Sequence, residues 1–80
     1  MMIKVKIEDI FNILNTTFQN SNIPRDCRNL KIDDFDEWDS LGNFNLLLDI
    51  EEFYQIKFTI DQMGELNSVK DIIKALEDGK

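Results

Sequence analysis

Histidine is absent from the 80 residues, and cysteine occurs only once, at Cys27. Without histidine, a serine or cysteine nucleophile lacks its usual base, and a zinc site lacks a usual ligand. A lone cysteine cannot form an internal disulfide, which suits a reducing cytoplasm. We therefore interpret Cys27 as an incidental loop thiol and expect no catalytic residue and no metal site in this chain.

Glycine and proline are scarce too, with three and one residues, which favours helices over a many-turned β fold. No apolar run approaches the length of a membrane span, and the N-terminus shows no secretory signal. We expect one domain over residues 1–80, located in the cytoplasm and without membrane insertion.

Basic residues are outnumbered, because nine Lys and Arg face sixteen Asp and Glu, giving a net charge of −7. This balance argues against binding to nucleic acid and predicts that the protein is steered toward basic partner surfaces. We also expect a monomer. The acids between residues 33 and 39 lack the alternating spacing and central glycine of a calcium loop, so we interpret them as a solvated acidic segment.

The spacing of apolar residues predicts main helices over about 4–18, 40–54 and 68–78. A short fourth helix is indicated by Thr59 and Gln62, which form a capping-box pattern, with Ile60, Met63 and Leu66 as its apolar positions. Asn67 and Ser68 mark the start of the last helix, and Gly79 suits its exit. The expected fold is all-α, a small four-helix bundle.

Two further features qualify this pattern. In the first helix Val5 and Ile13 fall off the apolar stripe. Residues 19–39 form a long loop between the first two main helices, and a loop of this length needs contacts with the core. Its expected anchors are Leu30, Ile32, Phe35 and Trp38.

The helix over 40–54 carries two apolar stripes, more than a surface helix usually buries. On a helical wheel one stripe comprises Leu46, Leu47, Ile50 and Tyr54, which we assign to the core. The other comprises Leu41, Phe44 and Leu48, flanked by Glu51 and Glu52. Either the long loop covers this second stripe, or the stripe is an exposed surface for a partner.

The tetrapeptide Asp39-Ser40-Leu41-Gly42 opens the same helix, where Asp39 or Ser40 can act as the N-cap. The tripeptide Asp-Ser-Leu by itself is weak evidence that the serine has a function. Together with Ile50-Glu51-Glu52, Phe58 and Val69, it resembles the acyl carrier proteins. The resemblance runs without an obvious gap from about residue 35 to residue 76, half of the chain.

The resemblance implies that a phosphopantetheinyl transferase attaches 4′-phosphopantetheine from coenzyme A to Ser40, and that the terminal thiol then carries an acyl or aminoacyl group as a thioester. Asp39 would orient the site or bind a metal held by the transferase, or would only cap the helix. Loading and processing enzymes would contact Leu41, Phe44 and Leu48, and their basic residues would meet Glu51 and Glu52. Met63 would either extend this surface or belong to the core.

The chain also departs from the family pattern. Asp36, Glu37 and Trp38 stand where many members have Leu-Gly and a small residue. Gly42 and Asn45 replace acids that fatty-acid carriers usually have. We expect Trp38 to pack the loop against the bundle rather than to contact partners. The thinner acidic surface favours a carrier of a dedicated pathway over housekeeping fatty-acid synthesis.

A second hypothesis belongs to a different functional class. The chain would be a carrier-like adaptor without a prosthetic group, and it would bind partner proteins through Leu41, Phe44 and Leu48. In that case Ser40 would serve only as part of the helix start.

Overall fold

The computed structural model describes residues 3–78 and contains four helices. Within these residues the only β pairing is an isolated bridge between Lys31 and Ser68, so the expectation of an all-α fold is confirmed. The predicted helix exit at Gly79 lies outside the described residues. The helices are α1 (Ile7–Thr17), α2 (Ser40–Tyr54), α3 (Ile60–Glu65) and α4 (Val69–Glu77).

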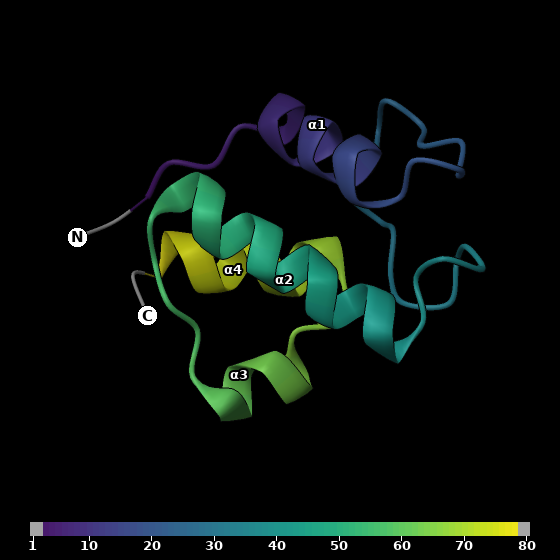
Figure 1. The fold of residues 1–80 in the computed structure, drawn as a ribbon. Coiled ribbons are helices and arrows are strands. Elements are labelled where there is room, and N and C mark those ends of the chain that lie inside the picture. Colours follow the sequence, from purple (N-terminus) through teal and green to yellow (C-terminus); the bar gives the residue numbers. More distant parts are fainter. Residues whose placement is uncertain (1–2, 79–80) are drawn as a thin grey trace.

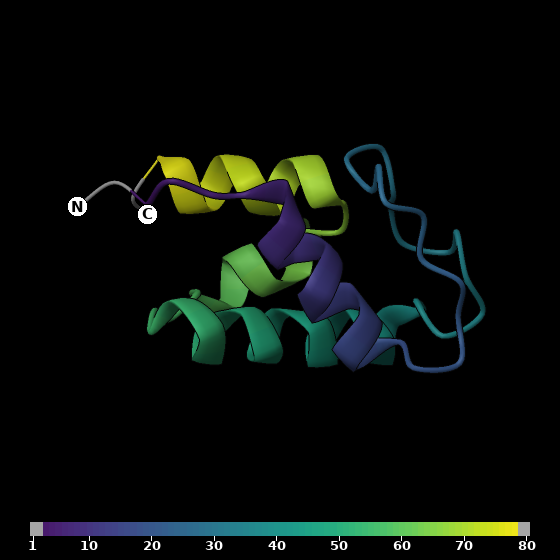
Figure 2. The same ribbon diagram turned by 90° about the horizontal axis from the view of Figure 1, so that it is seen from above.

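Helix α2 lies at the centre of the molecule (Figure 1). It is flanked by α1 on one side and by the short α3 on the other, and α4 lies behind it in this view. The view from above shows that α2 and α4 form two layers, with α1 crossing in front of them (Figure 2). The long loop between α1 and α2 folds over one end of the bundle, next to the start of α2.

Side-chain caps fix three of the four helix starts. Asp39 caps α2, and Ser68 caps α4 by accepting a hydrogen bond from the Asp71 amide. At α3, Thr59 and Gln62 form the predicted capping box. The prediction for α1 was wrong at its start, because the chain is still extended at Lys6, which makes no side-chain cap, and the helix begins only at Ile7.

The core draws on all three long helices and on the loop. The buried helical side chains include Leu46, Leu47 and Ile50, as predicted for the first stripe of α2. Two expectations were wrong. Ile13 is buried although it falls off the α1 stripe, because α2 packs beside it, and Ile60 is 90 % exposed because it occupies the first, outward-facing turn of α3.

Aromatic packing holds the loop on the bundle. The Trp38 ring is fully buried and stacks on Phe18 from the end of α1, with their ring centroids 5.5 Å apart. Phe35 adjoins both rings, with its centroid 6.3 Å from that of Trp38 and 6.4 Å from that of Phe18. The prediction that Trp38 packs the loop against the bundle is confirmed. Cys27, interpreted as an incidental thiol, is a fully buried core residue.

Backbone hydrogen bonds tie the loop to the junction between α3 and α4. The Ile32 amide donates to the Asn67 carbonyl at 2.8 Å, and the Val69 amide donates to the Leu30 carbonyl at 2.9 Å. Leu30 and Ile32 also pack against the core, as predicted for loop anchors. The loop is therefore a fixed part of the fold that supports the start of α2.

Within residues 3–78, none of the helices has the length and apolar character that crossing a bilayer requires.

Candidate functional site

Ser40 is the first residue of α2, and its side chain is exposed. Asp39 is the N-cap: its Oδ1 accepts the Gly42 amide at 2.8 Å, while its carbonyl accepts the Asn43 amide at 2.8 Å. This leaves the amides of Ser40 and Leu41 and the Ser40 hydroxyl without a hydrogen-bond partner among the described residues. An exposed hydroxyl thus lies beside two unused amides at the positive end of a helix dipole.

Gly42 allows the loop to approach the first turn of α2 closely. A Cβ at this position would lie 2.0 Å from the Glu37 carbonyl oxygen and 3.2 Å from the Phe18 ring. Gly42 is accordingly buried, and the loop backbone covers it. The sequence interpretation placed Gly42 on the surface, as a position where an acid had been lost. The structure corrects this interpretation, because this loop conformation leaves no room for any side chain there.

The side chain of Glu37 fixes the loop at the same point. Its Oε1 accepts hydrogen bonds from the Asn20 amide at 3.0 Å and from the Ser21 hydroxyl at 2.6 Å. Glu37 therefore joins the beginning of the loop to its end, while its carbonyl lies over Gly42. Glu37 and Trp38, where the sequence differs from the acyl carrier pattern, therefore hold the loop against the turn that begins at Ser40.

A buried chain of hydrogen bonds passes through Asn43, one turn below Ser40. The Trp38 indole Nε1 donates to Asn43 Oδ1 at 2.9 Å, and Asn43 Nδ2 donates to the Leu66 carbonyl at 2.9 Å. Asn43 is only 6 % exposed. It links the loop, α2 and the end of α3. Sequence reasoning missed this residue, although Asn43 falls within the core stripe of the helical wheel, where a polar side chain indicates a buried hydrogen-bonded contact.

The second stripe of α2 is exposed. Leu41, Phe44 and Leu48 are 69 %, 46 % and 41 % exposed, so the loop does not cover them. This settles the alternative that the sequence left open about the stripe's burial. Met63, on α3, is partly buried and packs against the core. We call Leu41, Phe44 and Leu48 the docking face.

The two acids beside the docking face have different environments. Glu52 is exposed, as expected. Glu51 is only 9 % exposed, and its Oε2 accepts the Phe58 amide at 2.6 Å. The expectation that Glu51 meets basic residues of partners is corrected, because its carboxylate serves the fold by binding the segment that follows α2.

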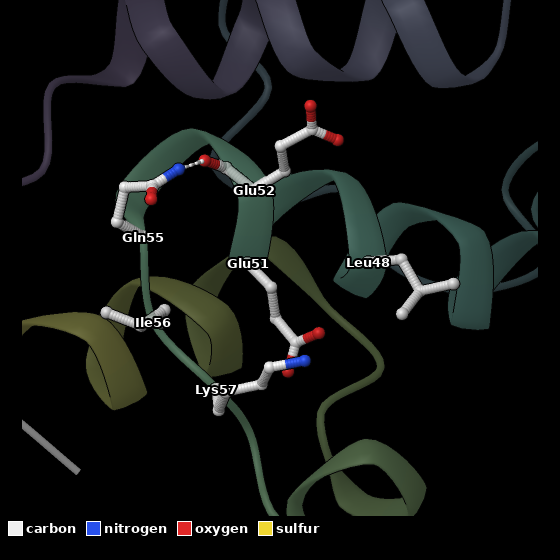
Figure 3. A pocket seen from close by; sticks show the side chains of 6 residues that line it. All are labelled: Leu48, Glu51, Glu52, Gln55, Ile56 and Lys57. Atoms are coloured by element: carbon white, nitrogen blue, oxygen red, sulfur yellow. Dashed lines mark hydrogen bonds between the residues drawn. The ribbon is translucent and has the colours of Figure 1, made fainter.

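A pocket of about 570 Å³ lies at the far end of α2 from Ser40. In Figure 3, Glu51 points down from the helix toward Lys57, with Ile56 to its left and Leu48 to its right, while Glu52 points up, toward α1. Gln55 ends the helix in a left-handed conformation, with φ of 56°, and its Nε2 donates to the Glu52 carbonyl at 2.6 Å. The docking face therefore runs from Ser40 to this pocket.

The acids of the loop do not converge. Over residues 3–78 the structure brings together no group of three or more His, Cys, Asp or Glu side chains that could hold a metal ion. Asp34 instead pairs with Lys31 at 3.1 Å, and hydrogen bonds from the Lys31 backbone and side chain lower the pKa of its carboxyl.

Comparisons with models of protein families, with curated proteins and with solved structures gave no match.

Proposed function

We propose that the chain is a carrier protein of the acyl carrier type, with the corresponding four-helix bundle, that bears 4′-phosphopantetheine on Ser40. The observation that carries the proposal is an exposed hydroxyl at the first residue of α2, directly beside an exposed apolar face on the same helix. A phosphodiester on this hydroxyl would accept hydrogen bonds from the unused amides of Ser40 and Leu41, at the end of the helix that favours an anion.

The chemistry requires no base in this chain. The Ser40 Oγ forms a bond to the phosphorus that carries the pantetheine in coenzyme A, and the bond from that phosphorus to the nucleotide phosphate breaks. A base of the transferase takes the hydroxyl proton, and adenosine 3′,5′-bisphosphate leaves. The attached arm supplies a thiol, which holds cargo as a thioester. Asp39 keeps the turn in place, since its carboxylate caps the helix.

Recognition by partner enzymes would rest mainly on the docking face. Leu41 and Phe44 lie within the first turn and a half of α2, close to the modified residue, and Glu52 adds a negative charge. No acid can replace Gly42 under the Glu37 carbonyl, so the acidic surface beside Ser40 stays thin. We infer a monomeric cytoplasmic carrier of a dedicated pathway, which takes an amino acid, a hydroxy acid or a short acyl group from its loading enzyme.

The test is modification in vitro. The protein is incubated with coenzyme A, Mg²⁺ and a broad-specificity phosphopantetheinyl transferase, and its intact mass is measured. We expect the gain of one phosphopantetheine, and none in Ser40→Ala. Ser68→Ala is the matched control, because it also removes a serine at a helix start, yet this variant should still be modified. A folded protein that several transferases leave unmodified would contradict the proposal.

The adaptor hypothesis uses the same docking face without a prosthetic group. The two functions are separated by comparing Ser40→Ala with Phe44→Glu in a complementation assay of the native host. A carrier loses function with either substitution. An adaptor loses function only with Phe44→Glu, because the exposed Phe44 contacts the partner while Ser40 only begins the helix.

A further inference from the structure

Phe53 is a large apolar residue that the docking face does not include. Its side chain is 52 % exposed, and its ring meets Tyr54 edge-on, with the centroids 4.8 Å apart. At 100° per residue, Phe53 lies roughly 140–180° around α2 from Leu48 and Phe44. It is therefore on the opposite side of the helix, next to α1.

A pocket of about 510 Å³ adjoins Phe53, between α1 and the end of α2. The buried side chain of Ile13 supplies an apolar floor. A hydrogen bond of 2.6 Å from the Thr17 hydroxyl to Asp49 Oδ2 holds the two helices together at this place. We call this the α1–α2 pocket, and it is lined by Asn12, Ile13, Thr16, Asp49, Glu52, Phe53 and Gln55.

The charge of the pocket is of one sign. Its lining includes two carboxylates, those of Asp49 and Glu52, and no basic side chain. Glu52 projects toward α1, as Figure 3 shows. An apolar floor with acids at the rim complements an apolar side chain that is flanked by Lys or Arg. A second copy of this chain is a poor occupant, since each copy has a net charge of −7.

The shape of the pocket favours a helix over a small molecule. It is an open hollow between two helices, and binding sites for small molecules enclose most of their ligand. An amphipathic helix can instead lay one apolar side chain into such a hollow and place its polar residues on the rim.

We propose that the α1–α2 pocket is a second docking surface, which takes a basic amphipathic helix of a partner protein. An apolar side chain of that helix packs on Phe53 and Ile13, and its Lys or Arg residues pair with Asp49 and Glu52. Phe53 lies on the opposite side of α2 from Phe44, so the apolar contacts of this pocket are separate from those of the docking face, and Glu52 lies at the edge of both surfaces. This inference stands whether or not Ser40 is modified.

The test is a nuclear magnetic resonance titration of the full chain with a synthetic amphipathic helix of Leu and Lys. We expect saturable shifts of the amides of Thr16, Phe53 and Gln55, which persist in Phe44→Glu. Phe53→Ser should weaken this binding at least tenfold, as truncation of an interface aromatic often does. A helix in which Glu replaces Lys should not bind.

Charge variants at the rim keep the test independent of Phe53. Thr16 is exposed on α1, and Lys and Glu are better helix formers than Thr, so both substitutions should preserve the fold. Thr16→Lys should weaken binding and Thr16→Glu should strengthen it. All three pocket variants should match the parent protein in the extent of Ser40 modification by the transferase. The proposal is overturned if the synthetic helix of Leu and Lys does not bind, or if the resonance shifts that it causes map only to Leu41 and Phe44. It is also overturned if Thr16→Lys and Thr16→Glu bind this helix with equal affinity.

Discussion

Asn43 shows how much one side chain contributes to the candidate site. Its side chain bonds both to the last part of the loop, through Trp38, and to the end of α3, through the Leu66 carbonyl. All of these groups are buried, so water does not replace a lost partner. Two contacts therefore hold the first turn of α2. Asn43 bonds it to Trp38 and to the Leu66 carbonyl, and the Glu37 carbonyl packs against Gly42.

We predict that Asn43→Ala lowers the free energy of unfolding by about 2–4 kcal/mol, because it leaves a buried indole N–H and a buried carbonyl unpaired. Asn45→Ala is the control. Asn45 is exposed on the same helix, and its loss should change stability by less than about 0.5 kcal/mol. Urea unfolding followed by Trp38 fluorescence measures both. Equal effects of the two variants would show that the hydrogen bonds through Asn43 contribute little.

Tyr54 has the opposite character, because its buried hydroxyl has no hydrogen-bond partner among residues 3–78. Burial, and secondarily the charge of Asp9, raises the pKa of its phenol above the ordinary value of 10.0. The unfolded chain then loses this proton first as the pH rises. The contribution of Tyr54 to stability is therefore complete below pH 10 and declines as the pH rises toward the folded-state pKa.

We predict that Tyr54→Phe unfolds at neutral pH with a free energy equal to that of the parent or up to about 1 kcal/mol higher, because an unpaired polar group is removed. Its advantage should grow above pH 10, where the parent loses the contribution of the phenol. Urea midpoints at pH 7, 9, 10 and 11 test this. An advantage that stays constant over this range would refute the assigned shift.

At the scale of the element, the positions of the helices could be predicted from local sequence patterns. The burial of some of their side chains could not, because it depends on residues far away in the sequence. The bounds of α2 and the caps of α3 and α4 were predicted because caps and apolar spacing are local signals. The exposure of the docking face was left open, since it depended on where the loop folds.

Two of the errors have the same origin. Glu51 is buried by the chain that follows α2, and Gly42 is buried by the Glu37 carbonyl. Each is a contact between segments that a helical wheel treats separately. The carrier function and the role of Ser40 rest on resemblance and on the geometry of the α2 start, and they stay predictions.

Two helical glycines provide a matched test of the loop contact. A Cβ added at Gly64, in α3, would meet no neighbouring atom within 4 Å, so Gly64→Ala should stabilise the protein by about 0.5–1 kcal/mol through helix propensity. Gly42→Ala brings the same propensity gain but places Cβ 2.0 Å from a backbone oxygen. We expect a net destabilisation of about 1–3 kcal/mol, because the loop must shift.

Thermal or urea unfolding of the two variants measures the difference. A slower transfer of phosphopantetheine to Gly42→Ala would add that the loop position matters to the transferase. If both variants were stabilised alike, the loop would not be packed against α2 as described.

At the scale of the molecule, charge is divided between two regions of the chain. Residues 33–65 carry ten acids and one base, while the rest of the chain carries six acids and eight bases. The acidic region includes the end of the loop, α2 and α3, and the other region includes α1 and α4. A basic partner is therefore attracted preferentially to the side that bears Ser40.

We predict that kcat/KM for modification of Ser40 falls by about tenfold when NaCl is raised from low to high concentration, because added salt screens this attraction. Glu52→Gln and Glu77→Gln change the net charge equally but lie on α2 and α4. At low salt only Glu52→Gln should slow the reaction clearly. A rate without salt dependence, or equal effects of both variants, would show that charge does not orient the encounter.

The contacts that support Ser40 also set a condition on biosynthesis. The Leu66 carbonyl and the Val69 amide, which bind Asn43 and Leu30, come from the last part of the chain. A ribosome-bound chain that ends before Leu66 already contains the Asp-Ser-Leu motif but lacks both partners. We therefore expect a transferase to modify nascent chains only after the start of α4 has emerged, so that cargo is loaded onto a turn that these contacts already support. Stalled chains of increasing length, assayed for modification, would reveal the threshold.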